Sequence, residues 1–179
     1  MTKKAFLTEV SQNVSSCLQL ALLLEVSAYP KPGNVHRTAD FQGTRYEHFL
    51  ASAVAVAPHF KRAAMQGVSV SHGKLRLDEV EVGRIIKEAV LDMNAWQHGG
   101  NTFLGSIILL VPMGVAAGMT SAQEKFSVTK MRENLKRVTA LTSPTDAVNV
   151  YDAIKIAKPG GLGKAPRLDV GDASSKQKI

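Results

Sequence analysis

The sequence predicts an all-α protein, a single domain in which a bundle-like array of helices surrounds one central apolar helix. Apolar residues recur at helical spacing through most of the 179 residues, and no segment sustains the alternation typical of strands. The stretch from Ser106 to Met119 is apolar on nearly every face, which is typical of a helix at the centre of a fold. We expect residues 1–170 to form the domain and residues 171–179 to form a polar tail.

The first predicted helix runs from about Thr8 to Ala28. Its apolar stripe consists of Val14, Cys17, Leu18, Ala21 and Leu22. Glu25 falls on the same stripe one turn further along, so helical geometry directs its carboxylate toward the core. A buried carboxylate needs a cation, a metal or several hydrogen-bond donors as partners. The alternative is that the helix frays before Glu25 and leaves that residue in solvent.

Two more helices are predicted before the central one. The second covers about residues 46–66, and Pro58 either kinks it or starts a new segment. Residues 68–80 are predicted to form a loop, because a His-Gly pair interrupts their weak alternation. The third helix covers about residues 78–97 and has a clean amphipathic stripe: Val82, Ile85, Ile86, Ala89, Val90, Met93 and Trp96.

The central helix follows a glycine pair. Gly99 and Gly100 end the preceding helix, and Asn101 or Thr102 can cap the next one. The apolar run 106–119 is shorter than the roughly 20 residues that a bilayer span requires, so it is interpreted as a buried core helix.

Two further helices complete the array. One covers about residues 129–141. The next begins with Ser143 as N-cap and Pro144 at the first helical position, and it ends at Pro159.

Composition narrows the classes of partner and the compartment. The net charge of +7 and the pI near 9.6 favour anionic partners such as nucleotides, coenzymes, phosphates or nucleic acid, although a solvated basic surface gives the same charge. Aromatic residues total 6%, which argues against a stacking surface for nucleic acid. A single cysteine and the lack of a secretory h-region fit a cytoplasmic protein, and no membrane association is expected.

Two loops gather groups that can bind phosphate. Residues 30–40 contain Lys31, Asn34 and Arg37, all of which can donate to phosphate oxygens. Residues 98–105 place backbone N–H groups at the start of the central helix, where the helix dipole favours an anion. Glu25 and Asp40 could hold a Mg²⁺ ion that arrives with a triphosphate. Each loop is equally well explained as an ordinary turn between helices.

Other site classes find no support in the sequence. The run Gly160 to Lys164 resembles the end of a P-loop, but Ala165 stands where Ser or Thr would bind Mg²⁺ and Lys158 stands where the earlier glycine belongs. The five histidines show no zinc-binding spacing, and one cysteine cannot build a zinc finger.

The two loop motifs resemble those of one enzyme family. "LLLEVSAYPKPGNVHR" and "GGNTFLGSIILLVP" are similar to the E-V-x-x-x-P-K-P-G-[LN]-V-[DH] and G-x-N-T-[HN]-x-G stretches of the triphosphoribosyl-dephospho-CoA synthase family. The archaeal-type branch is most similar, since it has the P-K-P-G-N-V-H-R form and a later segment like residues 146–164. The resemblance covers essentially the whole chain.

The resemblance implies an all-α transferase that joins ATP to 3′-dephospho-CoA. A ribose hydroxyl of the acceptor attacks C1′ of the ATP ribose, and adenine leaves. The implied catalytic residues are Glu25, His36 and Asp40, with Glu25 and Asp40 also as Mg²⁺ ligands. The implied nucleotide-binding residues are Lys31, Pro32, Gly33, Asn34, Arg37, Gly100, Asn101 and Thr102.

This chain departs from the family pattern in three ways. His36 stands where lyase-linked members usually have Asp, with only Asp40 to match the polar segment that follows. Phe103 and Leu104 replace a His-Lys pair, which removes a cation. Members also run longer, which implies that a C-terminal helical part is missing here. We therefore expect a homo-oligomer or a partner chain that supplies the missing helices, and a non-catalytic nucleotide-binding protein or half of a split assembly remains the alternative.

Overall fold

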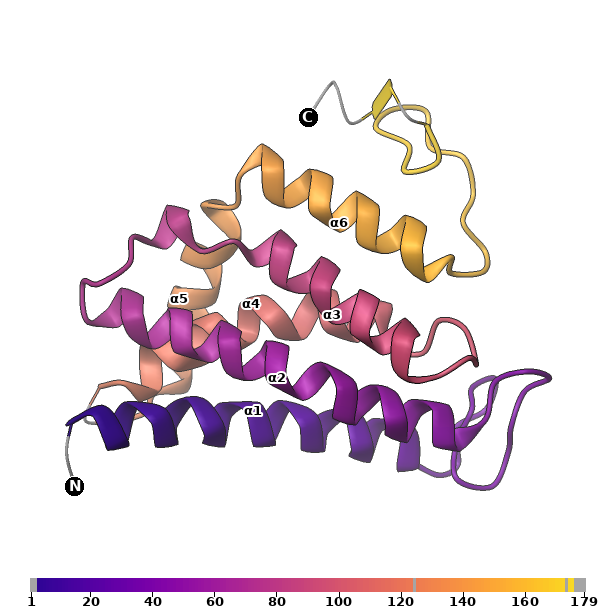
Figure 1. The fold of residues 1–179 in the computed structure, drawn as a ribbon, viewed down its shortest axis with the longest axis horizontal. Coiled ribbons are helices and arrows are strands. Elements are labelled where there is room, and N and C mark those ends of the chain that lie inside the picture. Colours follow the sequence, from indigo (N-terminus) through magenta and orange to yellow (C-terminus); the bar gives the residue numbers. More distant parts are fainter. Residues whose placement is uncertain (1–2, 124, 173, 176–179) are drawn as a thin grey trace.

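A computed structural model describes residues 3–123, 125–172 and 174–175, and within them it contains six α-helices and no strand, which confirms the all-α prediction (Figure 1). The helices are α1 (Lys3–Ser27), α2 (Tyr46–Ser71), α3 (Val82–Trp96), α4 (Leu104–Ser121), α5 (Val128–Ala140) and α6 (Pro144–Ala157). A 3₁₀ turn, η1 (Leu77–Glu79), precedes α3. Part of the expected polar tail, at 173 and 176–179, lies outside the described residues.

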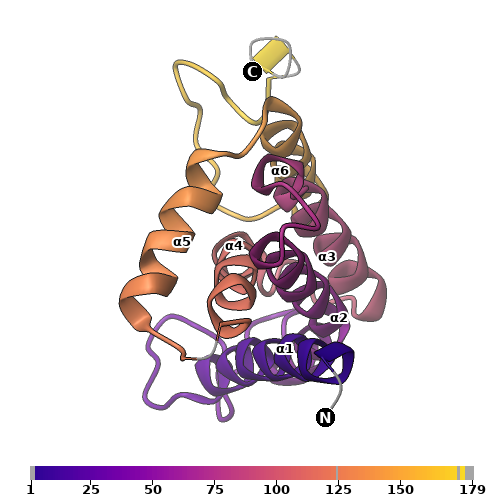
Figure 2. The same cartoon turned by 90° about the vertical axis from the view of Figure 1, so that its left-hand side faces the viewer.

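Helix α4 is the centre of the array, as its apolar composition predicts. It contacts all five other helices, and Figure 2 shows it in the middle, with α1 below, α6 above, α5 at the left and α3 at the right. Its buried residues include Ile107, Val111 and Val115, which are fully inaccessible to solvent. Within the described residues α4 is also the one helix that is long and apolar enough to cross a membrane, but 56% of that stretch is buried inside the fold. Burial in the core explains its composition without a membrane.

Glycines let α2 and α4 approach at backbone contact. A Cβ atom added to Gly118 would lie 2.1 Å from the carbonyl oxygen of Ala64, and one added to Gly67 would lie 2.0 Å from that of Val115. Any side chain at these positions would therefore force the two helices apart. The small residues fix both the distance between α2 and α4 and their register.

The helix directions bring both loop motifs to one end of the molecule. Ser15 Oγ donates to the carbonyl of Ala57 (2.7 Å) and Gln19 Nε2 to that of Ala53 (3.2 Å), so α1 runs antiparallel to α2. Ser52 on α2 meets Thr102 just before α4, and further along both helices Ala64 lies against Gly118, so α2 and α4 run parallel. The loop from α1 to α2 and the loop from α3 to α4 consequently lie together at the right-hand end in Figure 1.

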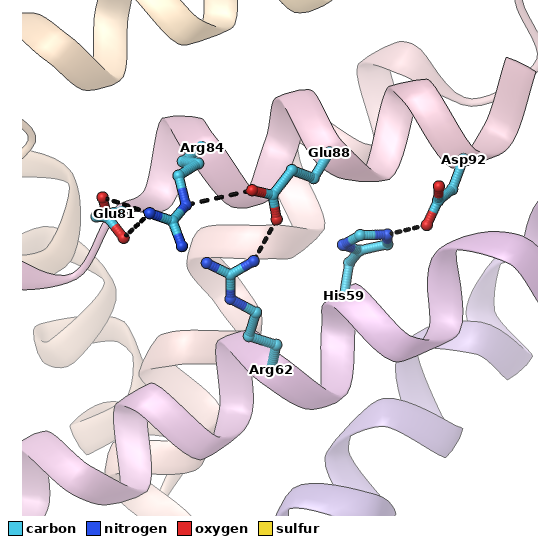
Figure 3. A network of polar contacts seen from close by, with 6 residues as sticks. All are labelled: His59, Arg62, Glu81, Arg84, Glu88 and Asp92. Carbon is cyan, nitrogen blue, oxygen red and sulfur yellow. Dashed lines mark hydrogen bonds and ion pairs between the residues drawn. The ribbon is translucent and has the colours of Figure 1, made fainter.

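A ladder of ion pairs connects α2 to α3 on the surface (Figure 3). His59 Nε2 lies 2.7 Å from Asp92 Oδ2, and Arg62 pairs with Glu88. Arg84 binds Glu88 at 3.2 Å on the same helix. The order of these pairs shows that α3 runs antiparallel to α2. Helix α3 therefore ends at the same end of the molecule as the α1–α2 loop. Such partly exposed pairs each contribute only about 0–1 kcal/mol, so they select the register more than they stabilise the fold.

The prediction that Glu25 lies in the core is wrong. The buried face of α1 carries Ser11, Ser15, Leu18, Leu22 and Val26, whereas Cys17 is exposed and the Glu25 side chain is 48% exposed. The sequence pattern misleads because the two serines count as polar. Each satisfies its hydroxyl on a backbone carbonyl, so both can face the core at little cost. The helix continues to Ser27, so fraying is not the reason for the exposure.

The second helix is longer than predicted. It passes through Pro58 and ends at Ser71, so the predicted loop at 68–80 shrinks to a turn and η1. Pro58 removes the donor for the carbonyl of residue 54, and Val54 lies on the exposed side of α2, where water can replace the lost bond. The third helix begins at Val82, four residues after the predicted start.

The start of α6 follows the prediction. Ser143 is the N-cap, its Oγ accepts from the N–H of Asp146 (3.1 Å), and Pro144 opens the helix. Asp146 is buried and also accepts from the N–H of Gly83 (2.8 Å), which anchors α6 to the first turn of α3.

We predict that Gly118→Ala lowers the free energy of unfolding by about 1–3 kcal/mol, because the new methyl group meets the Ala64 backbone. Gly105→Ala on the same helix is the matched control, since no atom lies within 4 Å of a Cβ there. It should leave stability unchanged or raise it by up to about 1 kcal/mol through better helix propensity. Urea unfolding followed by circular dichroism measures both, and equal stabilities would contradict the glycine contact.

Candidate functional site

A pocket of about 310 Å³ lies between the two motif loops. The α1–α2 loop and its flanking helices contribute Glu25, Lys31, Asn34, Val35, Phe41, Thr44 and Phe49. The α3–α4 loop and the first turn of α4 contribute Asn101, Thr102, Phe103 and Ser106. The lining therefore combines charged, amide and hydroxyl groups with an aromatic wall, in which the rings of Phe49 and Phe103 meet edge to face at 5.0 Å.

The ion pair of Glu25 and Lys31 lies at the pocket. Lys31 Nζ lies 2.5 Å from Glu25 Oε1, and the lysine side chain is only 17% exposed. The expectation that Glu25 has a cationic partner is thus met, although its carboxylate is half-exposed. Because solvent screens such a pair, it contributes little to stability and either charge can turn to a ligand. The pocket offers both a cation for phosphate and a carboxylate for a metal or a hydroxyl proton.

Two tight turns give the α1–α2 loop its shape. The backbone groups of His36 and Ala39 exchange two hydrogen bonds of 3.0 Å, and those of Phe41 and Thr44 exchange bonds of 2.9 and 3.2 Å. Asp40 lies between these turns, and its Oδ1 accepts from the N–H of Tyr46 at the start of α2 (2.8 Å). The loop is therefore held by its own backbone and by the N-terminus of α2.

The α3–α4 loop is organised by a buried amide. The Gln97 side chain is 6% exposed, accepts from the N–H of Gly99 (2.5 Å) and donates to the carbonyl of Gly100 (2.9 Å). The N-cap of α4 is Phe103 rather than the predicted Asn101 or Thr102, but Asn101 Oδ1 still accepts from the N–H of Leu104, the first residue of the helix (3.1 Å). Thr102 Oγ1 donates to Ser52 Oγ on α2 (2.7 Å).

One contact joins the two loops directly. Thr44 Oγ1 donates to the carbonyl of Gly99 at 2.6 Å. Gly99 also lies flat against His48 on α2, because a Cβ there would be 2.0 Å from the imidazole Nδ1. These contacts set the width of the pocket between the loops.

The structure brings together about half of the residues expected from sequence. Glu25, Lys31, Asn34, Asn101 and Thr102 line the pocket. The remaining six are not among its lining residues: Pro32, Gly33, His36, Arg37, Asp40 and Gly100. His36 instead accepts from Thr38 through Nδ1 (3.3 Å to the backbone N) and packs its ring edge-on against Tyr29, with the ring centroids 5.6 Å apart.

Sequence reasoning missed several lining residues, among them Phe41, Thr44, Phe49 and Ser106. The sequence marks these four residues as candidates only through their closeness to the two motifs. Phe41 and Thr44 belong to the second tight turn, and Phe49 and Ser106 to the first turns of α2 and α4. None of them is distinguished by spacing alone.

The expected metal ligands are separated by the fold. Among the described residues no group of three or more His, Cys, Asp or Glu side chains could hold a metal ion. Glu25 lines the pocket, whereas Asp40 holds the start of α2. One carboxylate beside a polyphosphate suits Mg²⁺, which usually binds through one or two carboxylates together with substrate phosphates. Of the two expected metal ligands, Glu25 therefore lies at the pocket and Asp40 does not.

A larger hollow of about 510 Å³ lies at the opposite end of α1 and α2. Its lining includes Leu7, Met65, Val68 and His72, and it contains no residue of either motif. The Nδ1 atom of His72 is buried there without a hydrogen-bond partner. The smaller pocket is the better candidate site because it collects the polar groups that the two loops converge on.

Fold and pocket define an all-helical protein with a polar, cation-bearing site where two helices begin, which suits a small anionic ligand. A family model described as ATP:dephospho-CoA triphosphoribosyl transferase, CitG, matches residues 11–179. The chain therefore belongs to this family, and the resemblance in the two motifs is confirmed. The family's reaction transfers the triphosphoribosyl group of ATP to dephospho-CoA. Comparisons with curated proteins and with solved structures give no significant match.

Proposed function

We propose that the pocket between the two loops binds ATP as the triphosphoribosyl donor, together with Mg²⁺. The observation that carries this proposal is the convergence of Lys31, Asn34, Asn101 and Thr102, from two loops far apart in sequence, on one pocket in a member of this transferase family. The N-termini of α2 and α4 both lie at this end, and their dipoles favour a polyphosphate. A cytoplasmic location fits the nucleotide substrates and the single cysteine.

Glu25 and Lys31 have different roles in this proposal. Lys31 leaves Glu25 to bind the triphosphate when ATP enters, which adds charge-assisted hydrogen bonds in a partly closed site. The freed Glu25 carboxylate then either binds the Mg²⁺ that accompanies the triphosphate or accepts the proton of the attacking hydroxyl. The sequence-predicted roles of His36 and Asp40 become indirect, because these residues hold the loop at the pocket rather than line it.

The reaction is tested by following free adenine. With Mg²⁺, ATP and dephospho-CoA, the protein should release one adenine for each acceptor modified, measured by liquid chromatography. Omission of dephospho-CoA should suppress the release. Lys31→Gln should lower kcat/KM for ATP by about tenfold or more, the order expected for a lost charged hydrogen bond. Lys130→Gln is the matched control, since Lys130 pairs with Glu133 (3.1 Å) on α5, outside the pocket.

Glu25→Gln in the same assay separates the two roles of the carboxylate. Loss of Mg²⁺-dependent ATP affinity identifies a metal ligand, and loss of turnover with ATP binding retained identifies a base. ATP binding by the wild-type protein without adenine release would favour the alternative of a non-catalytic nucleotide-binding protein. Glu25→Gln and Lys31→Gln variants with wild-type kinetics would show that ATP binds elsewhere.

We further propose that the protein self-associates through its exposed apolar side chains. Leu20 and Leu24 on α1 are 53% and 62% exposed, and Leu109 on the central helix is 67% exposed. Helices α1 and α4 pack against each other, and large apolar side chains exposed on neighbouring helices favour association where they form one patch. Sedimentation velocity at micromolar concentration should give a species larger than 19.2 kDa, and replacement of Leu24 and Leu109 by Gln should shift it toward the monomer. A stable wild-type monomer would contradict this proposal.

A further inference from the structure

The pocket is small for a reaction with two nucleotide substrates. Its volume of about 310 Å³ is at the lower end of the range of roughly 300–1,000 Å³ for one small ligand. ATP and dephospho-CoA each carry an adenosine and at least two phosphates. A large part of one substrate must therefore bind on the surface that adjoins the pocket.

An aromatic and cationic cluster adjoins the pocket on the same loop. The Tyr29 side chain is 63% exposed, with the His36 ring edge-on to it (centroids 5.6 Å apart, planes at 71°). The Arg37 guanidinium lies over the Tyr29 ring, 5.8 Å from its centroid. His36 is held in turn by Thr38, whose Oγ1 lies 3.1 Å from Nδ1. The exposed Tyr29 ring therefore has an aromatic neighbour on one side and a cationic one over its face.

Arg37 is available for an anionic ligand. Within the part of the chain that the structure describes, no carboxylate lies within ion-pair distance of its guanidinium, whereas Arg62, Arg76 and Arg84 all have acidic partners. A guanidinium offers paired donors that match a phosphate group, and an aromatic face can stack on a base. Together the two groups suit an adenine nucleotide.

The cluster is continuous with the pocket along the chain. Asn34 and Val35 line the pocket, and His36 and Arg37 are the next two residues. Consecutive Cα atoms are about 3.8 Å apart, so the cluster lies within a nucleotide's length of the pocket.

We propose that Tyr29, His36 and Arg37 form an outer subsite for the adenine and diphosphate of the acceptor, dephospho-CoA. This inference rests on the proposed binding of ATP in the pocket. The C1′ atom of ATP must be shielded from water, which would otherwise intercept the triphosphoribosyl group, so the recess between the two loops suits the donor better than the open surface does. The acceptor carries a long pantetheine arm and suits the open surface. Tyr29 stacks on its adenine, Arg37 binds its diphosphate, and His36 positions Tyr29.

Binding measured separately for each substrate tests the subsite. Isothermal titration of the full chain with dephospho-CoA and, in separate runs, with Mg²⁺ and ATP gives the two Kd values. Arg37→Gln and Tyr29→Leu should each raise the Kd for dephospho-CoA at least fivefold and leave that for ATP within twofold. Tyr29→Phe keeps the ring and should bind like the wild type. Arg132→Gln, an exposed arginine on α5, removes the same charge elsewhere and should change neither value.

Each failure points to a different conclusion. If Arg37→Gln and Tyr29→Leu leave the Kd for dephospho-CoA within twofold of wild type, the outer subsite is wrong while the function stands. If Arg37→Gln and Arg132→Gln weaken both substrates equally, the effect is overall charge and the subsite is again wrong. If the wild type does not bind dephospho-CoA at all, the proposed function fails with it.

Discussion

The close approach of α2 and α4 is the constraint on which the rest of the structure depends. Gly67 and Gly118 bring the two backbones into contact, and no larger residue fits at either position. This contact sets the distance between the two parallel helices and holds their register. As a result Ser52 in the second turn of α2 meets Thr102 just before α4, and the two motif loops lie side by side. The pocket is a product of helix packing as much as of the loops themselves.

The same packing gives the candidate site a positive electrostatic character. Two helix N-termini, those of α2 and α4, lie at one end of the molecule and contribute partial positive charge there. Lys31 adds a full charge that is balanced by Glu25 in the free protein. Without a ligand, the two charges of the ion pair neutralise each other. Because the pair is partly exposed to solvent, separating Lys31 from Glu25 costs little free energy. In the proposed ATP complex, the polyphosphate takes the place of Glu25 beside Lys31, and the metal or a hydroxyl proton takes the place of Lys31 beside Glu25.

Much of the fold is readable from sequence, because local signals agree with tertiary packing. The uniformly apolar α4 lies at the centre, and the Ser143–Pro144 start of α6 is found as expected. The failures occur where packing overrides pattern. Because Ser11 and Ser15 are buried, the face of α1 that packs on the core does not include Glu25. Helix α2 continues through Pro58, since the residue whose carbonyl loses its donor, Val54, lies on the exposed side of the helix.

The site is predicted less well than the fold, and for a physical reason. The motifs identify Glu25, Lys31, Asn34, Asn101 and Thr102. Whether a neighbouring loop residue faces the pocket depends on long-range contacts, such as the bond from Thr44 to Gly99, that leave no periodic trace in the sequence. This is why Phe41 and Thr44 are missed and why His36 and Arg37 are placed in the pocket although they lie beside it.

Hydrogen exchange on the full chain, with and without Mg²⁺ and ATP, tests most directly whether the two loops form one nucleotide site. The account predicts that ATP slows amide exchange in residues 31–45 and in residues 98–103 together, and leaves residues 128–140 of α5 unchanged. Protection confined to the opposite end, around Leu7, Val68 and His72, with both loops unaffected, would contradict it.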